Sequence, residues 1–131
     1  MSFVLDASAT LAFVFPDERD EAAIELATRL EESGAVAPLI WRWEMQNVVI
    51  GAERRGRLTE RKATTLLSDI DGLPVELDAS EGAHVELARR YALSAYDALY
   101  LDLAFRKHLP LATRDARLLE AARRLGVGLL S

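Results

Sequence analysis

Four acidic side chains, far apart in the sequence, carry the clearest chemical signal: Asp6, Glu44, Asp97 and Asp115. Asp6 follows the apolar run Phe3-Val4-Leu5, and Asp115 follows Leu111-Ala112-Thr113-Arg114. In parallel sheets, binding sites form at the carboxyl ends of the strands. Two carboxylates that directly follow predicted strands are therefore expected at the same edge of a sheet.

Each of the three aspartates also has an ordinary structural explanation. Asp6 can cap the helix that follows it, which contributes on the order of 1 kcal/mol. Asp97 fits a capping box in which its carboxylate reaches back to the Ser94 amide. Asp115 can be a first-turn acid that the helix dipole favours, and Thr113 either caps that helix or hydrogen-bonds a ligand. None of these residues is decisive alone.

Glu44 is placed on the predicted inner face of a helix over residues 39–55. Helical spacing puts these residues on one face: Ile40, Glu44, Asn47, Val48 and Gly51. A buried carboxylate is costly unless it is paired or bound to a metal. The alternative is that Glu44 reaches the rim and pairs with Arg54 or Arg57. The apolar neighbours Trp41 and Val48 favour the functional interpretation.

Four carboxylates brought together without a cation would repel one another, and some would stay protonated. A divalent metal ion removes that penalty. Because the chain has no cysteine, and its two histidines are far apart, an all-oxygen site for Mg²⁺ or Mn²⁺ is favoured over a zinc site. We interpret His84 and His108 as surface residues.

Short apolar runs alternate with amphipathic helices and define the elements that must position these acids. Strands are predicted over 3–5, 35–37, 74–77, 109–112 and 127–130. Helices are predicted over 11–15, 18–32 (capped by Asp17), 39–55, 59–72 (capped by Thr59), 80–91, 95–108 and 116–125. This alternation predicts one α/β domain over residues 1–131, with three α/β/α layers around a mostly parallel sheet of five strands.

The composition sets further limits. The formal net charge of −5 gives no global electrostatic argument for a nucleic-acid partner. No apolar run is long enough to span a bilayer, and the first residues do not resemble a secretory signal. The absence of cysteine is compatible with a reducing cytosol. We therefore expect a cytoplasmic protein with no membrane partner.

Several motifs together resemble one known family. The segments VLDASA, WEMQNV, SAYDALYLDLA and LPLATRDARLLEAARRLGV run along nearly the whole chain. Their order and separations resemble those of PIN-domain ribonucleases of the VapC toxin type. Each motif is weak alone, and the combination is fairly specific.

The resemblance implies a metal-dependent ribonuclease whose acidic cluster corresponds to Asp6, Glu44, Asp97 and Asp115. The acids would hold one or two Mg²⁺ ions, with Mn²⁺ as a substitute, for phosphodiester hydrolysis. The three residues that match positions lining the cluster are Ser8, Asn47 and Thr113. Trp41 and Trp43 depart from the smaller residues usual before the glutamate, which affects the expected shape of the groove.

The resemblance also implies partners. RNA would be the substrate, and we expect Arg114 and Arg117 to contact it because they flank Asp115. A VapB-type antitoxin would silence the toxin, and the toxin itself would be a homodimer. The third helix fits a partner-facing role because Trp43, Val49 and Ile50 add apolar surface beyond its Glu44 face.

Alternatives remain at this stage. A phosphoacceptor receiver domain of similar length also has an Asp–Mg²⁺ site, but it requires an acidic pair after the first strand and a lysine after the last, and both are missing. A dehalogenase-like phosphatase requires an acid at position 8, where this chain has serine. A PIN scaffold that no longer cuts RNA is a third alternative. Asp102, about 140° round the helix from Asp97, is expected behind the site, at a subunit contact, or paired with Arg106.

Overall fold

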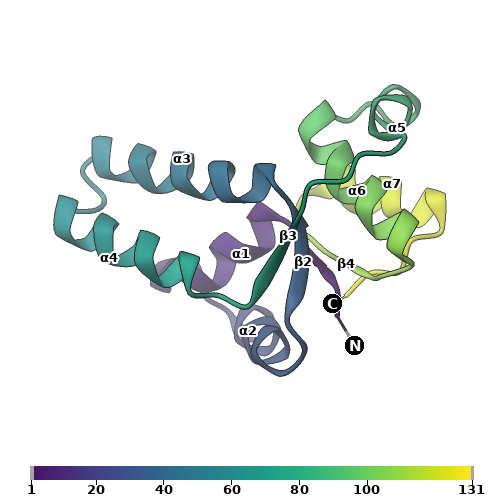
Figure 1. Cartoon of the computed structure of the whole chain (residues 1–131). Helices are drawn as coiled ribbons and strands as arrows, with labels where there is room; N and C mark the ends of the chain where they lie inside the picture. Colours follow the sequence, from purple (N-terminus) through teal and green to yellow (C-terminus); the bar gives the residue numbers. More distant parts are fainter. Residues whose placement is uncertain (1, 131) are drawn as a thin grey trace.

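Seven α-helices surround a small sheet in the described part of the chain, residues 2–130 of a computed structural model (Figure 1). The strands are β1 (Val4–Leu5), β2 (Ala35–Pro38), β3 (Val75–Asp78) and β4 (Leu111–Ala112). The helices are α1 (Ala7–Val14), α2 (Glu21–Ser33), α3 (Ile40–Arg54), α4 (Glu60–Asp71), α5 (His84–Tyr91), α6 (Ala95–Lys107) and α7 (Ala116–Leu125), with a 3₁₀ turn at Pro16–Glu18.

The sheet is entirely parallel, with the order β3-β2-β1-β4. Val4 pairs with Val36 on one side, and Leu5 pairs with Ala112 on the other. The chain therefore passes from β1 outward to β2 and β3, and then returns to the opposite side of β1 for β4. This reversal creates a switch point between β1 and β4, which is where open α/β sheets place their sites.

The predicted fifth strand at 127–130 is wrong as a strand. The structure has only an isolated parallel bridge between Leu129 and Leu111. Two backbone hydrogen bonds, from the Leu111 N–H to the Gly128 carbonyl and from the Leu130 N–H to the Leu111 carbonyl, hold this segment at the edge. Since β4 itself is only two residues long, it offers no longer ladder to extend.

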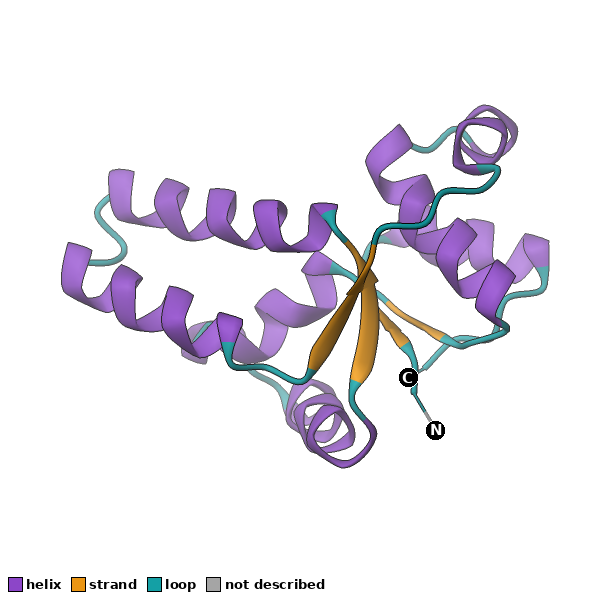
Figure 2. Cartoon of the chain, in the orientation of Figure 1, coloured by secondary structure: helices purple, strands orange, loops and turns teal. Residues whose placement is uncertain are grey.

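The molecule has the predicted three layers. Figure 2 shows α1 to α4 on one side of the sheet and α5 to α7 on the other. The hairpin of α3 and α4 projects well beyond the sheet. No helix among the described residues has both the length and the apolarity needed to cross a membrane.

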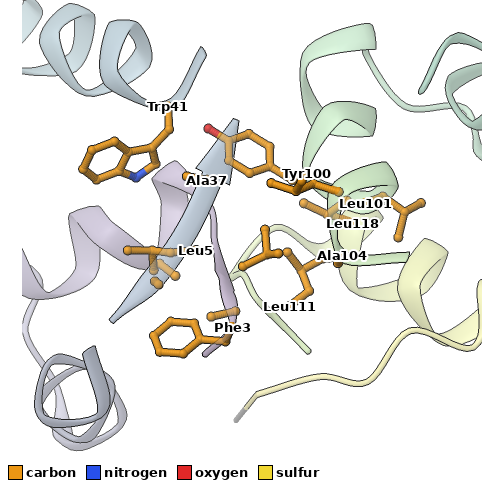
Figure 3. Close-up of a cluster of buried hydrophobic side chains, with 14 of the residues drawn as sticks. Phe3, Leu5, Ala37, Trp41, Tyr100, Leu101, Ala104, Leu111 and Leu118 are labelled. Carbon is orange, nitrogen blue, oxygen red and sulfur yellow. The ribbon is translucent and has the colours of Figure 1, made fainter. Parts of the chain in front are cut away.

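The core lies on both faces of the sheet, as Figure 3 shows. The ring of Phe3 and the side chain of Leu5 are fully buried, and Leu111 and Leu118 close the core on the α7 side. Strands buried on both faces are typically continuous apolar runs, which explains the sequence of β1.

Most element boundaries agree with the predictions within a few residues. The exceptions are three helix starts: α1 begins at Ala7 rather than residue 11, α5 at His84 rather than residue 80, and α2 at Glu21 rather than residue 18. The prediction extended this helix from Glu18 with Asp17 as its cap. The structure instead places a 3₁₀ turn there, and Asp20 caps α2 by accepting a hydrogen bond from the Ala23 N–H at 2.8 Å. Gly34 ends the helix at φ +69°, a left-handed conformation that glycine adopts without steric cost.

Candidate active site

Asp6 has the first of its two expected roles, as the cap of a helix. It caps α1, because its carboxylate accepts a hydrogen bond from the Ala9 N–H at 2.8 Å. It is only 4% exposed at the end of β1. The Ser8 hydroxyl donates to the same carboxylate, at 2.8 Å from one oxygen and 2.9 Å from the other, and the Thr113 hydroxyl donates to it as well. Ser8 and Thr113 therefore line Asp6.

These two hydroxyls also join the β1 and β4 ends of the sheet. The Arg114 N–H donates to the Ser8 oxygen at 2.8 Å, and the Asp115 N–H donates to the Thr113 oxygen at 3.1 Å. Asp115 is the N-cap of α7 rather than a residue of its first turn, since it accepts from the Leu118 N–H at 2.9 Å. The switch point thus holds both carboxylates on fixed backbone.

Asp97 lies in the first turn of α6, partly buried. The Ser94 hydroxyl accepts a hydrogen bond from the Asp97 N–H at 3.0 Å, which is one half of the predicted capping box. The other half is not formed: within residues 2–130, no hydrogen bond joins the Asp97 carboxylate to the Ser94 amide. The carboxylate is therefore not used to cap its own helix.

Glu44 approaches from the other face of the sheet. The buried stripe of α3 consists of Trp41, Met45, Val49 and Ala52, one position away from the predicted stripe. Glu44 lies at the margin of this stripe, half-buried, and accepts a hydrogen bond from the Tyr100 hydroxyl of α6. The predicted alternative of a pair with Arg57 is not what the structure has, since Arg57 pairs with Asp17 at 3.1 Å.

The electrostatics indicate that these acids face one another. Burial raises the pKa of Asp6, and the charge of Asp115 raises it further, against the hydrogen bonds from Thr113, Ala9 and Ser8. Burial also raises the pKa of Glu44 and of Asp97, and neighbouring acids add to both shifts: Asp97 and Asp6 for Glu44, and Asp115 for Asp97.

A divalent cation would remove this mutual repulsion, and carboxylate oxygens are the ligands that Mg²⁺ and Mn²⁺ prefer. The donor set therefore fits such an ion in its chemistry. The side chains are not gathered as a finished cage, however, because no group of three His, Cys, Asp or Glu residues in the described chain is arranged to hold a metal. Asp6 and Asp115 are instead turned toward helix N–H groups.

Asn47 lies one turn after Glu44 on α3. It is exposed on α3 and has no side-chain hydrogen bond to another described residue. Because the buried stripe is shifted by one position, the residue one turn after Glu44 faces solvent. Val49, expected to add apolar surface, is fully buried in the monomer, whereas Trp43 is 58% exposed.

The two arginines near Asp115 differ. Arg114 makes two hydrogen bonds to the carboxylate of Asp20, at 2.8 and 2.6 Å, so its guanidinium is already paired across 94 residues of sequence. Arg117 is exposed and forms no ion pair with a described carboxylate. Asp102 is confirmed as the partner of Arg106, at 2.8 Å, and it also accepts from the Ala83 N–H at 3.1 Å.

Sequence reasoning missed Tyr100, Thr10 and Asp20. Tyr100 was detectable, because it lies three residues after Asp97 and shares its helix face. Thr10 is buried, accepts from the Trp41 indole N–H at 2.9 Å, and donates to the Asp6 carbonyl at 2.7 Å. No local pattern signals the pairing of Asp20 with Arg114.

Comparison with known proteins identifies the fold and the family. The model of the PIN domain matches residues 3–124, and the chain belongs to this family. The resemblance inferred from the sequence motifs is therefore confirmed, and the receiver and dehalogenase-like alternatives are set aside.

Three similar proteins illustrate the relationship. Ribonuclease VapC3 of Pyrobaculum aerophilum is 30% identical over 125 residues, which cover 92% of this chain and 94% of that protein. The crystal structure of PAE2754 from Pyrobaculum aerophilum has a TM-score of 0.72 at 24% identity, covering 92% of this chain and 79% of that one. A toxin-antitoxin complex from Klebsiella pneumoniae has a TM-score of 0.56 at 21% identity, covering 86% of each chain.

Proposed function

We propose that the chain is a metal-dependent endoribonuclease and the toxin of a type II toxin–antitoxin pair. The observation that carries the proposal is the set of four carboxylates, Asp6, Glu44, Asp97 and Asp115, three of which have raised pKa values through burial and each other's charge. Membership of the PIN family and similarity to a protein named Ribonuclease VapC3 support the same activity.

In this proposal Asp6, Asp97 and Asp115 bind Mg²⁺, or Mn²⁺ in its place, and Glu44 either completes the site or orients the attacking water. The ion would supply charge neutralisation at the scissile phosphate and an activated water. The chain's own contribution is to fix the acids. Helix caps hold Asp6 and Asp115, the start of α6 holds Asp97, and the Tyr100 hydroxyl holds Glu44.

Ser8 and Thr113 would act through Asp6. Their hydroxyls donate to its carboxylate and accept from the backbone of the β4–α7 turn. These hydrogen bonds restrict rotation of the Asp6 carboxylate, which caps α1 and would also bind the metal ion. Asn47, exposed on α3 one turn after Glu44, would line the site from that helix.

The partners in this proposal are RNA, a VapB-type antitoxin and a second copy of the chain. The similarity to a chain of a toxin-antitoxin complex supports an antitoxin. The exposed ring of Trp43 on α3 supports an interface there, because large exposed aromatic side chains are enriched where proteins meet. A cytoplasmic location follows from the proposed substrate.

The test is cleavage of total RNA by the purified chain with Mg²⁺, with Mn²⁺ or with a chelator, beside the variant Asp97→Asn. We expect cleavage with either metal, no cleavage with the chelator, and a loss of at least about a hundredfold in the variant. Asp97→Asn is a suitable probe because the Asp97 carboxylate does not cap its own helix, so asparagine keeps the shape and removes the charge.

Two outcomes would contradict the proposal. Equal cleavage by both proteins would indicate a contaminant or a different site. Folded wild-type protein that binds an antitoxin-type partner but cuts no RNA with any metal would indicate a non-catalytic PIN scaffold.

A further inference from the structure

A hollow of about 440 Å³ lies between the end of α5 and one face of α7. Its lining includes the Tyr91 ring from α5 and the side chains of Arg117, Glu120 and Arg124 from α7. This hollow is separate from the four carboxylates, and neither the family match nor the named relatives assign a role to it.

The hollow is positively charged on a chain whose net charge is −5. Arg117 and Arg124 line the hollow, and Arg90 lies over the Tyr91 ring. None of these three arginines lies within 4.0 Å of a described carboxylate. The single acid of the lining, Glu120, is itself near Arg123, at 4.0 Å. The cations of the hollow are therefore available to an anionic ligand.

Tyr91 adds an aromatic surface among these cations. Its ring is half-buried, packs in part on the core, and has the guanidinium carbon of Arg124 at 5.4 Å and that of Arg90 at 6.0 Å from its centroid. An aromatic ring flanked by guanidinium groups is a surface on which an unpaired base stacks.

The hollow and the carboxylates share the same backbone segments. Arg117 is two residues after Asp115, and Tyr91 is three residues before Ser94, the cap of the helix whose first turn holds Asp97. Asp97 and Asp115 are close enough for the charge of one to raise the pKa of the other. An extended ligand that leaves the carboxylates along α7 would therefore enter this hollow.

We propose that the hollow binds single-stranded RNA beside the carboxylate cluster, with phosphates on Arg117 and Arg124 and one base on Tyr91. This inference rests on the proposed function and adds the path of the substrate. RNA is favoured over an acidic peptide because a peptide carboxylate would use the arginines but not the ring. A single strand is favoured because a paired base has no free face for stacking.

The experiment measures binding of a short fluorescent RNA of random sequence by anisotropy, in chelator so that the RNA stays intact, over a series of salt concentrations. Arg117→Gln and Arg124→Gln are each expected to weaken binding and to reduce the slope of log K against log salt by about 0.7, the value for one phosphate contact on a single strand. Arg29→Gln, on the exposed side of α2 in the opposite layer, should leave the slope unchanged.

Tyr91 is tested with two variants, because the ring also packs on the core. Tyr91→Leu keeps apolar volume, and we expect it to weaken RNA binding roughly tenfold through lost stacking. Tyr91→Trp keeps an aromatic ring for stacking, and its affinity for RNA should stay near that of the wild type. The thermal midpoints and the Mn²⁺ affinities of all variants should stay near the wild-type values, since the acids are untouched.

The outcomes separate this inference from the proposed function. Unchanged salt slopes, or an equal effect of Arg29→Gln, would overturn the RNA path while leaving the nuclease proposal intact. Equal binding of a double-stranded probe would overturn the single-strand assignment. Variants that lose RNA binding in a protein that never cleaves would support the hollow and contradict the nuclease.

Discussion

The Tyr100 hydroxyl donates a hydrogen bond to the Glu44 carboxylate, and this contact joins helices on opposite faces of the sheet. The two residues are 56 positions apart. Tyr100 is only 1% exposed, and Figure 3 shows its ring beside β2 with the hydroxyl directed away from α6. Burial and the charges of Glu44, Asp6 and Asp97 raise the pKa of Tyr100, so the phenol remains a donor.

The first prediction is that Tyr100→Phe weakens Mn²⁺ binding by about tenfold, which is typical for loss of a group that orients a metal-binding side chain. The ring keeps its packing, and only the donor to Glu44 is lost. Isothermal titration with Mn²⁺ measures the effect directly. Tyr96→Phe is the matched control, since Tyr96 lies on the same helix and is 60% exposed. Equal affinities for both variants would remove Tyr100 from the site.

The second prediction concerns pH. The pKa values of Asp6, Glu44 and Asp97 are raised above their ordinary values of 3.8, 4.5 and 3.8. The folded state therefore binds more protons than the unfolded state above pH of about 4, and the free energy of unfolding increases as the pH falls from neutral toward that range. Urea denaturation in chelator measures this dependence.

At still lower pH, two other acids reverse this increase in the free energy of unfolding. Hydrogen bonds from Arg114 lower the pKa of Asp20 to about 2, and hydrogen bonds from Ser80 lower that of Asp78 to about 2. Their contribution is present above the ordinary aspartate value and is lost as the pH falls toward 2. Stability should thus pass through a maximum near pH 4. Above about pH 4, Asp97→Asn should make the free energy of unfolding depend less steeply on pH. An unchanged slope in that range would contradict the proposed repulsion.

The third prediction concerns the effect of metal on thermal stability. A ligand that binds only the folded state raises the free energy of unfolding by about 2.7 kcal/mol at a hundred times its Kd. Saturating Mn²⁺ should therefore raise the melting temperature of the wild type. Asp97→Asn should melt no lower than the wild type in chelator, because it relieves repulsion from Asp115, and it should lose the shift with Mn²⁺. A retained shift would exclude Asp97 as a ligand.

The fourth prediction separates a structural acid from the candidate site. Asp102 is 2% exposed and accepts from Arg106 and from the Ala83 N–H. Asp102→Ala leaves the Ala83 N–H and the Arg106 Nε–H without this acceptor, although Arg106 keeps its hydrogen bonds to Ser80, and should lower the free energy of unfolding by about 2 kcal/mol. Asp71→Ala breaks the exposed pair with Arg42, at 3.7 Å, and should cost no more than about 0.5 kcal/mol. Chemical denaturation measures both, and equal losses would contradict the role of burial.

Helix-capping residues made much of the fold predictable from the sequence. Gly34, Thr59 and Gly126 begin or end helices where the sequence predicted, because capping depends on neighbouring residues only. The start of α2 was less determined, since Asp17 and Asp20 were both competent caps and the proline between the helices favoured a 3₁₀ turn first. The strand predicted over 127–130 is only a single bridge in the structure, because strand pairing also depends on the length of the neighbouring strand β4.

The candidate site was predictable as a set of residues but not as a set of contacts. Asp6 and Asp115 follow strands, and parallel topology brings such positions together. The predicted buried face of α3 was wrong by one residue. Apolar side chains lie on several sides of Glu44, so the hydrophobic pattern does not define a single helical face. The pairing of Arg114 with Asp20 spans 94 residues, and no spacing rule indicates a contact between side chains so distant in sequence.

The bridge between Leu129 and Leu111 places the end of the described chain one strand away from β1, because Leu111 lies beside Val4 and Val4 belongs to the first strand. Figure 1 shows the start of β1 and the described segment after α7 at the end of the sheet away from α3, whereas Asp6 and Asp115 follow the carboxyl ends of β1 and β4. Joining these ends with a short linker and opening the chain at the exposed turn around Gly56 would give a circular permutant. The acids of such a protein would keep their order around the sheet, and only the connection between α3 and α4 would be cut.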